Sequence, residues 1–456
     1  MNETRKTIIF GGVAIGLALL AFLVNIPGSR TPEVFFDKGE LFFPEFTDPN
    51  VATTLEVIQY KEDTGSPVPF KVTFKEGIWT IPSHHDYPAD GKERLAKTAA
   101  GVINITKDDF RSDNSADHEA FGVIDPLDET NTSLKGRGER VTLKGASDQI
   151  LADFIIGKKV EGHDKFRFVR IPGQKRVYAA RMDIDISTTF SDWIEADLLK
   201  VAKSDIKQVT LKDYTIDERL RMVKQRDVIV LNKDGDDWTE KKMTDKQEVD
   251  KTKMNDLLKA VDELSIVGVR PKPPGLSDEL KTINEGVSLT MEDQLSLKSK
   301  GYYLHQGQLL SNEGELQTRT KDGVIYTLRF GEIVYGAGLE VTAGTNDNDT
   351  QESGDTGENR YLFITTSFDA SDFPEPQKPK NTDFQSKADS LWTDADRTNK
   401  KIFDKHEAWK KKIEKGQKLS DDLNTRFSKW YYVISSESFD KIHLKRNDLI
   451  KKKEDS

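Results

Sequence analysis

The sequence predicts an α+β protein in which one N-terminal transmembrane helix precedes two tandem repeated modules of antiparallel sheet plus helix, with a C-terminal helical excursion. Three observations support this prediction: an uncharged apolar run near the N-terminus, a pattern of strands and one helix that occurs twice, and a lysine-rich helical pattern after residue 376. A chain of 456 residues is long enough for more than one hydrophobic core, which agrees with two modules.

The apolar run is TIIFGGVAIGLALLAFLVNI, residues 7–26. A helix of that length spans roughly 30 Å, the thickness of a bilayer's hydrocarbon core. We expect residues 1–30 to form a cytoplasmic stub and this membrane anchor. The anchor residues are Thr7, Ile8, Phe10, Gly12, Gly16, Leu19, Leu20, Phe22, Leu23 and Ile26. The run exits through Asn25-Ile26-Pro27-Gly28, a poor cleavage site, which favours a retained anchor over a cleaved signal peptide.

Basic residues around the run predict its orientation. Arg5 and Lys6 precede it, and only Arg30 follows closely. The positive-inside rule therefore places the N-terminus in the cytoplasm and the bulk of the chain in the periplasm, at the inner membrane. Gly12 and Gly16 have the GxxxG spacing, which leaves a homodimer through this helix as an alternative.

A connector at residues 31–54 leads into the first module (55–200), and the second module follows at 201–375. In each module a β-rich run is broken by a glycine turn and resumes with Trp-Thr, which predicts a hairpin. Asp90 and Asp250 then precede helical patterns, and we expect both to act as N-caps. Further strands are predicted after each helix, among them RVTLKG in the first module and QLSLKS (294–299) in the second.

Residues 376–430 have the spacing of helices. We expect Gly416 to end one helix, and Ser420 with Asp421 to cap the next. The many lysines between positions 400 and 418 suggest an anionic partner. Three acids (Asp404, Glu407 and Glu414) offset them, which favours a solvated helix face. Residues 431–456 are predicted to be a returning strand and a charged tail.

Composition and motifs exclude several kinds of chemistry. The chain has no cysteine, so disulfides and thiolate metal sites are excluded, and its net charge of -10 argues against nucleic-acid binding. No phosphate loop, serine-nucleophile motif or histidine metal spacing occurs. We predict no catalytic residue, no metal site and no cofactor. Trp79, Tyr87 and Trp238 are candidates for stacking on a ligand, with core or hairpin packing as the more favoured alternative.

The stretch Phe121-Gly122-Val123-Ile124-Asp125-Pro126 resembles the "yGLdpP" loop of a bacterial family called domain of unknown function 4340. Gly157 in FIIGKK and the run RVYAAR (176–181) resemble the strands that follow it in that family. The resemblance covers most of residues 55–200 and is weaker in the second module. It implies a single-pass envelope protein that accompanies ABC transporters of the gliding-motility type, and the acidic two-module form resembles planctomycete members.

No catalytic residue is attached to that family, so the resemblance transfers none. We therefore expect a non-enzymatic accessory or scaffold subunit of a membrane complex, whose partners are membrane lipid and ABC transporter subunits. The alternative is a binding module for envelope glycan or a small ligand.

Overall fold

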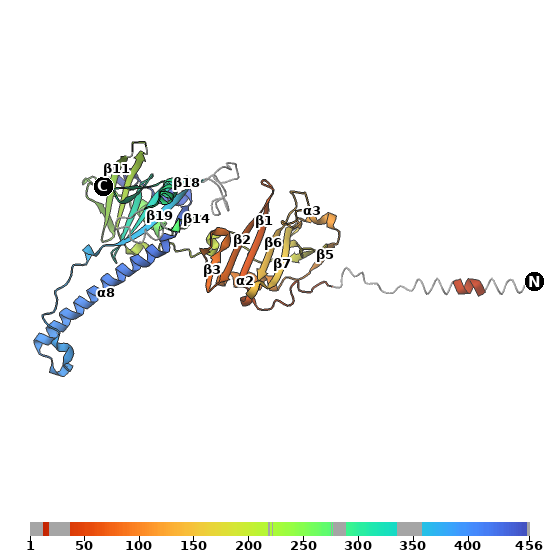
Figure 1. Cartoon of the computed structure of the whole chain (residues 1–456), viewed down its shortest axis with the longest axis horizontal. Coiled ribbons are helices and arrows are strands. Elements are labelled where there is room, and N and C mark those ends of the chain that lie inside the picture. Colours follow the sequence, from red (N-terminus) through yellow and green to blue (C-terminus); the bar gives the residue numbers. More distant parts are fainter. Residues whose placement is uncertain are drawn as a thin grey trace, which may run out of the picture. The chain divides into compact units, whose positions relative to one another are not determined.

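The computed structural model describes residues 12–17, 37–217, 219–220, 222–274, 276, 289–334 and 358–453. The chain forms two compact units. Unit 1 takes the residues up to Pro69 together with Arg94–Ile186, and unit 2 takes Phe70–Glu93 and the residues from Ser187 on. The fold is mixed α+β with antiparallel sheets, as the sequence predicts (Figure 1).

The predicted membrane anchor is described only at residues 12–17, which are helical and include Gly12 and Gly16. The other anchor residues lie outside the described part: Thr7, Ile8, Phe10, Leu19, Leu20, Phe22, Leu23 and Ile26. No helix within the described part is both long and apolar enough to cross a bilayer. The anchor stays a prediction from the sequence.

The first sheet has the strand order β4-β3-β2-β1-β6-β7-β8-β9-β5. Its strands are β1 (Thr54–Lys61), β2 (Ser66–Lys75), β3 (Ile78–Ile81), β4 (Tyr87–Pro88), β5 (Asp109–Ser112), β6 (Glu139–Lys144), β7 (Ile150–Val160), β8 (His163–Arg170) and β9 (Val177–Arg181). Helix α2 (Lys92–Ile103) lies between β4 and β5 in the chain and buries Leu95, Ala99 and Val102 from one of its faces. Helix α3 (His118–Phe121) is a single turn.

The second sheet has the strand order β12-β11-β10-β17-β18-β19-β20-β14. Its strands are β10 (Ile206–Asp217), β11 (Met222–Asp234), β12 (Asp237–Glu240), β14 (Gly268–Pro271), β17 (Glu315–Thr320), β18 (Val324–Val334), β19 (Asn359–Phe368) and β20 (Trp430–Ile434). Two small sheets pair β13 (Gln247–Val249) with β21 (Ile450–Lys452) and β15 (Tyr302–His305) with β16 (Gln308–Ser311). The helices of this unit are α4 (Lys251–Asp262), α6 (Met291–Ser299), α8 (Asp394–Ser428), α9 (Ser436–Ile442) and α10 (Arg446–Leu449).

The two sheets correspond strand by strand. The order β3-β2-β1-β6-β7-β8-β9-β5 matches β12-β11-β10-β17-β18-β19-β20-β14, and α2 and α4 occupy the same place in the chain order. The β2–β3 and β11–β12 turns each have a glycine with positive φ, 85° at Gly77 and 61° at Gly235, a conformation that glycine adopts without strain. Trp79 pairs with Phe74 across one turn, and Trp238 pairs with Lys233 at the same register position of the other.

Of the two aspartates predicted as N-caps, one caps its helix and the other does not. The Asp250 carboxylate accepts hydrogen bonds from the backbone N–H groups of Thr252 and Lys253, as expected of an N-cap. Helix α2 begins at Lys92, so Gly91, and not Asp90, directly precedes it.

Residues 294–299, predicted as a strand, are instead part of α6. The prediction was wrong because a local helix-start signal outweighs the alternation of apolar residues. Thr290 and Asp293 form a capping box, in which each side chain accepts a hydrogen bond from the other residue's backbone N–H.

The C-terminal region also differs. Helix α8 runs without interruption through Gly416, so the prediction of two helices was wrong. A Cβ at Gly416 would lie 2.8 Å from Phe368 Cδ2 and 2.9 Å from the Asp322 carbonyl oxygen. The glycine permits this close approach and does not end the helix. The residues after β20 form α9, α10 and β21, so much of the expected tail is folded.

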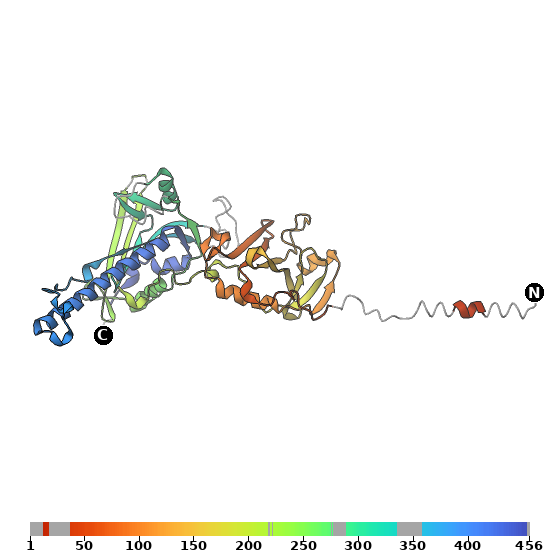
Figure 2. The ribbon, with the colours of Figure 1, turned by 60° about the horizontal axis from the view of Figure 1, so that its bottom comes forward.

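Helix α8 projects from the second sheet, and the segment before it doubles back near its far end (Figures 1 and 2). At that end Phe384 packs edge-on against Trp392 and Phe403, with ring centroids 6.0 and 5.6 Å away. The C-terminal half of α8 contacts β19, since the Asn424 side chain exchanges hydrogen bonds with the backbone of Thr366.

Candidate functional site

The motif loop, residues 121–126, follows the single turn of α3. The turn ends at Gly122, whose φ of 72° is left-handed and whose N–H donates to the Glu119 carbonyl oxygen at 3.1 Å. The chain then extends beside residues 136–138. Ile124 donates from its N–H to the Gly136 carbonyl oxygen (3.1 Å) and accepts from the Gly138 N–H (2.8 Å). This pairing holds the loop against the start of β6.

Two glycines under the loop allow this approach. A Cβ at Gly157 would lie 2.6 Å from Val123 Cγ1 and 3.0 Å from the Gly122 carbonyl oxygen. At Gly138 a Cβ would lie 2.8 Å from that same oxygen and 2.5 Å from Ile155 Cγ2. Real Cβ atoms essentially never come so close, so the loop and β7 need glycine at both positions. The motif residue Gly157 therefore has a packing role.

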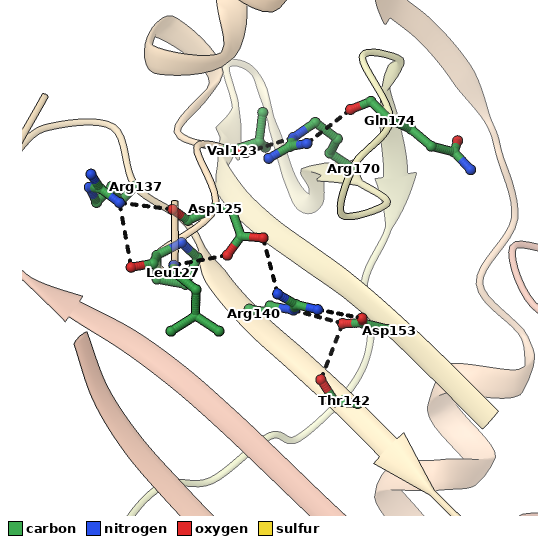
Figure 3. A network of polar contacts seen from close by, with 10 residues as sticks. Val123, Asp125, Leu127, Arg137, Arg140, Thr142, Asp153, Arg170 and Gln174 are labelled. Atoms are coloured by element: carbon green, nitrogen blue, oxygen red, sulfur yellow. Dashed lines mark hydrogen bonds and ion pairs between the residues drawn. The ribbon is translucent and has the colours of Figure 1, made fainter. Parts of the chain in front are cut away.

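Arg140 joins the loop to the sheet (Figure 3). Its guanidinium donates to both carboxylate oxygens of Asp153 on β7, from Nε at 3.0 Å and from Nη2 at 2.7 Å. Its Nη1 donates to the Asp125 carboxylate at 3.1 Å. The three side chains are 23%, 18% and 16% exposed, so the pairs are largely shielded from water. Thr142 donates a further hydrogen bond to Asp153 Oδ1, and the Leu127 N–H donates to Asp125 Oδ1.

Two further arginines hold backbone carbonyls of the same loop. Arg137 donates to the carbonyl oxygens of Asp125 (2.9 Å) and Ser133 (3.0 Å), and its guanidinium lies 4.5 Å from the ring centroid of Tyr60. Arg170 is buried and donates to the carbonyl oxygen of Val123 at 2.8 Å (Figure 3). Burial lowers the pKa of Arg170, because the charged guanidinium loses its hydration.

The motif site is thus a closed set of ion pairs and hydrogen bonds. Both carboxylates, Asp125 and Asp153, already face the Arg140 cation, so either would have to lose this pair before it could act as a general base. Across the described residues, no group of three or more histidine, aspartate or glutamate side chains could hold a metal ion. The geometry stabilises one conformation of the motif loop.

A cavity of about 590 Å³ in unit 2 is a second candidate. It lies beside the β15–β16 hairpin, and its lining includes the charged groups Lys212, Glu315 and Arg329. Glu315 is buried and pairs with Lys212 Nζ at 2.7 Å and Arg329 Nε at 3.3 Å. Burial, followed by the nearby Glu315 carboxylate, raises the pKa of Tyr214 to about 12, so this phenol stays protonated and donates to Glu315. The cavity offers polar groups that suit a small hydroxylated ligand.

Lys272 is a buried amine in the same unit. Its Nζ donates to the Phe427 carbonyl oxygen at 3.2 Å and lies 3.7 Å from the ring centroid of Phe363. Burial lowers the pKa of Lys272 well below its usual value. Phe427 is in the last turn of α8, where backbone carbonyls have no partner within the helix, and Lys272 Nζ satisfies one of them by its hydrogen bond. This amine therefore has a structural role at the end of α8.

The three aromatic candidates from the sequence lie in different surroundings. Trp79 is half-buried, with its ring centroid 5.2 Å from that of Phe74. Tyr87 is buried and packs edge-on against Phe190 and Trp430, and burial raises the pKa of its hydroxyl. Trp238 is half-buried on β12. The structure does not bring these side chains to either candidate site, since none is among the residues that form the motif network or line the cavity.

Of the charged residues in the motif network, the sequence motif included Asp125, but sequence reasoning missed Arg140 and Asp153, and it missed the charged residues of the cavity. Arg140, Thr142 and Lys144 alternate along β6 and so share one face, which is a detectable signal. Their partners come from other strands and from the motif loop, and the strand register that pairs them cannot be derived from the local pattern.

Residues 79–281 match the model of a family described as Domain of unknown function (DUF4340). This stretch contains the motif loop, Arg140, Asp153 and Gly157. The comparison confirms the family resemblance expected from the sequence. Neither a curated protein nor a solved structure matches the chain.

Proposed function

We propose that this chain, whose residues 79–281 match the DUF4340 family model, is a non-enzymatic accessory or scaffold subunit of a membrane complex. In this proposal the segment Thr7–Ile26 anchors it in the inner membrane and the bulk of the chain is periplasmic. Its partners would be membrane lipid and integral membrane proteins such as ABC transporter subunits.

One observation carries the proposal: the residues around the family motif hold its loop in place, and those of the described part do not converge on a reactive centre. Arg137, Arg140 and Arg170 all donate to this loop, and Gly157 gives it room. A loop fixed in this way presents a defined surface, which is what a docking partner needs. Leu127 and Leu134 lie on its exposed continuation. The matching strand orders of the two sheets add support, because a repeated module enlarges the surface available for contacts.

Photo-crosslinking in native membranes tests the proposal. A photoreactive residue replaces Leu127 or, separately, Leu134 in the full chain, and captured proteins are identified by mass spectrometry. We expect adducts with integral membrane proteins, ABC transporter subunits among them. The same probe at Lys241, an exposed position on another part of the chain, is the matched control. Adducts with no membrane protein from either leucine would contradict the proposal.

The anchor has its own test. The full chain should remain in the membrane pellet after an alkaline carbonate wash. Leu20→Arg places a cation at the centre of the apolar run, where it costs about 2.5–3.5 kcal/mol of insertion free energy, and should release a large part of the protein. Release of the unchanged chain by carbonate would rule the anchor out.

The cavity in unit 2 favours a second candidate function, the binding of an envelope glycan or another small polar ligand. Its volume of about 590 Å³ lies in the range of small-molecule sites. Calorimetric titration of the full chain with soluble glycan fragments should then give binding that is weakened in Gln225→Ala and Gln308→Ala, two lining residues. A lack of heat with every fragment would remove this candidate.

A further inference from the structure

Helix α8 has a row of cations along its exposed face. This row, the lysine stripe, consists of six exposed side chains: Arg397, Lys401, Lys405, Lys411, Lys415 and Lys418. At 3.6 residues per turn they fall on one side of the helix, and at 1.5 Å per residue the stripe is about 32 Å long.

The opposite face of α8 is the one that packs. Asn399, His406 and Ser420 are buried there. His406 Nε2 lies 3.1 Å from the Glu375 carboxylate, and Trp409 Nε1 donates to the Phe373 carbonyl oxygen at 2.8 Å. Because these contacts bind the inner face to the segment before α8, the stripe faces away from them.

The acids of α8 neutralise the stripe less than the sequence suggests. Glu407 pairs with Lys410 at 3.0 Å, and Asp404 pairs with Lys400; neither lysine belongs to the stripe. Glu414 lies about 100° around the helix from the centre of the stripe. Within the described part of the chain, no acid forms an ion pair with any of the six stripe residues. Asp404 lies on the same side of the helix as the stripe, about 25° from its centre, but its carboxylate pairs with Lys400, so the six stripe cations keep this face positively charged.

We propose that the lysine stripe docks on the anionic headgroup surface of a phospholipid bilayer. A band of cations about 32 Å long on one side of a helix can approach a flat anionic surface along its whole length, and the attractions of its members add. The stripe has no large apolar side chain, so docking would be electrostatic and would not involve insertion.

A bilayer suits the stripe better than a protein partner does. The buried centres of protein interfaces are enriched in aromatic residues and depleted in lysine, whereas lysine makes up most of this stripe. The choice of a bilayer also rests in part on the proposed anchor, which would keep a membrane surface within reach. The experiment below separates the two proposals.

A fluorescent probe on α8 tests the docking. The chain has no native cysteine, so Ala408→Cys, within the stripe and exposed, gives a single labelling site for an environment-sensitive dye. The labelled full chain is first incorporated into nanodiscs of neutral phosphatidylcholine, so that the predicted anchor is already inserted in a bilayer before vesicles are added. Vesicles of phosphatidylcholine with about 30% phosphatidylglycerol are then titrated in, and vesicles of phosphatidylcholine alone serve as the comparison. Failure to enter nanodiscs would count against the anchor only, since the soluble chain can be titrated in the same way.

The dye should respond to the anionic vesicles, and about 0.5 M salt should reverse the response by screening. Lys401→Glu, Lys411→Glu and Lys415→Glu together should weaken the apparent affinity on the order of a hundredfold. The matched control, Lys97→Glu with Lys159→Glu and Lys241→Glu, changes the net charge equally at exposed lysines outside α8. This control variant should keep an apparent affinity for anionic vesicles within a few-fold of that of the unchanged chain.

Three outcomes would overturn the docking proposal. One is an equal response to neutral and anionic vesicles. Another is an equal loss of affinity in the stripe variant and the control variant. The third is a response that depends on protein concentration without vesicles, which would identify a second copy of this chain as the partner. Circular dichroism of the stripe variant checks that α8 remains helical.

Discussion

The Arg140 guanidinium donates two parallel hydrogen bonds to the Asp153 carboxylate, from Nε to Oδ1 at 3.0 Å and from Nη2 to Oδ2 at 2.7 Å. This two-point geometry fixes the direction of the third arginine nitrogen, Nη1, which reaches Asp125 in the motif loop. The position of the loop therefore depends on a cross-strand pair between β6 and β7.

Replacing Arg140 tests this dependence. Arg140→Met leaves two largely shielded carboxylates without their cation, and should lower the free energy of unfolding of unit 1 by about 2–3 kcal/mol. Arg140→Lys should retain only part of the stabilisation that the arginine provides, because an ammonium cannot form the two-point contact. Denaturant titration measures the change in unfolding free energy, and hydrogen exchange of the β6 and β7 amides shows whether the loss is local to these strands. Arg111→Met is the control: its pair with Asp109 is 36% and 46% exposed, so the change should stay within about 0.5 kcal/mol.

Gly157→Ala tests the close approach under the motif loop. The new methyl group would meet Val123 and the Gly122 carbonyl oxygen, so the loop or β7 has to move, at a cost of about 2 kcal/mol. Hydrogen exchange should accelerate in residues 121–126 more than elsewhere. Gly162→Ala in the β7–β8 turn, where a Cβ has open space but φ is 75°, should cost about 1 kcal/mol and leave the loop unchanged. Equal effects on the loop from both variants would refute the packing role of Gly157.

Gly416→Ala should lower the stability of the protein, although helix propensity alone predicts that it raises it. In an exposed helix this change stabilises by about 1 kcal/mol. Here the Cβ would meet the Phe368 ring, so unit 2 should lose about 1–3 kcal/mol of unfolding free energy. Ala408→Gly on the exposed face should cost about 1 kcal/mol through propensity alone. A more stable Gly416→Ala protein in denaturant titration would show that α8 and β19 do not approach this closely.

The far end of α8 should loosen in acid. A hydrogen bond from the Thr393 N–H, followed by the ammonium of Lys387, lowers the pKa of Asp396 to about 2. Because the folded pKa lies below the unfolded value of about 3.9, the stabilisation is complete above that value and is lost as the pH falls through about 2. Hydrogen exchange of residues 384–403 should therefore accelerate over this window. Asp396→Asn should remove most of the pH dependence, and an unchanged profile in that variant would assign it to another group.

The sequence by itself determined the features that depend on neighbouring residues. The glycine turns at Gly77 and Gly235 need no distant partner, and neither does the cap at Asp250, since each uses backbone conformations or amides within a few positions. The repeated pattern in the sequence has its counterpart in the matching strand orders of the two sheets. The family also followed from short local motifs.

Only the tertiary structure decided what depends on residues far apart in the chain. Gly416 looks like a helix end in the sequence, yet it lies within α8, and a glycine stands there because Phe368 of β19 occupies the space that a side chain would need. Arg140 gained its role from a strand register that placed Asp153 beside it. The lysines of α8 formed a stripe only once packing had fixed which face of the helix is buried. In each case the deciding contact is non-local, and local periodicity contains no information about it.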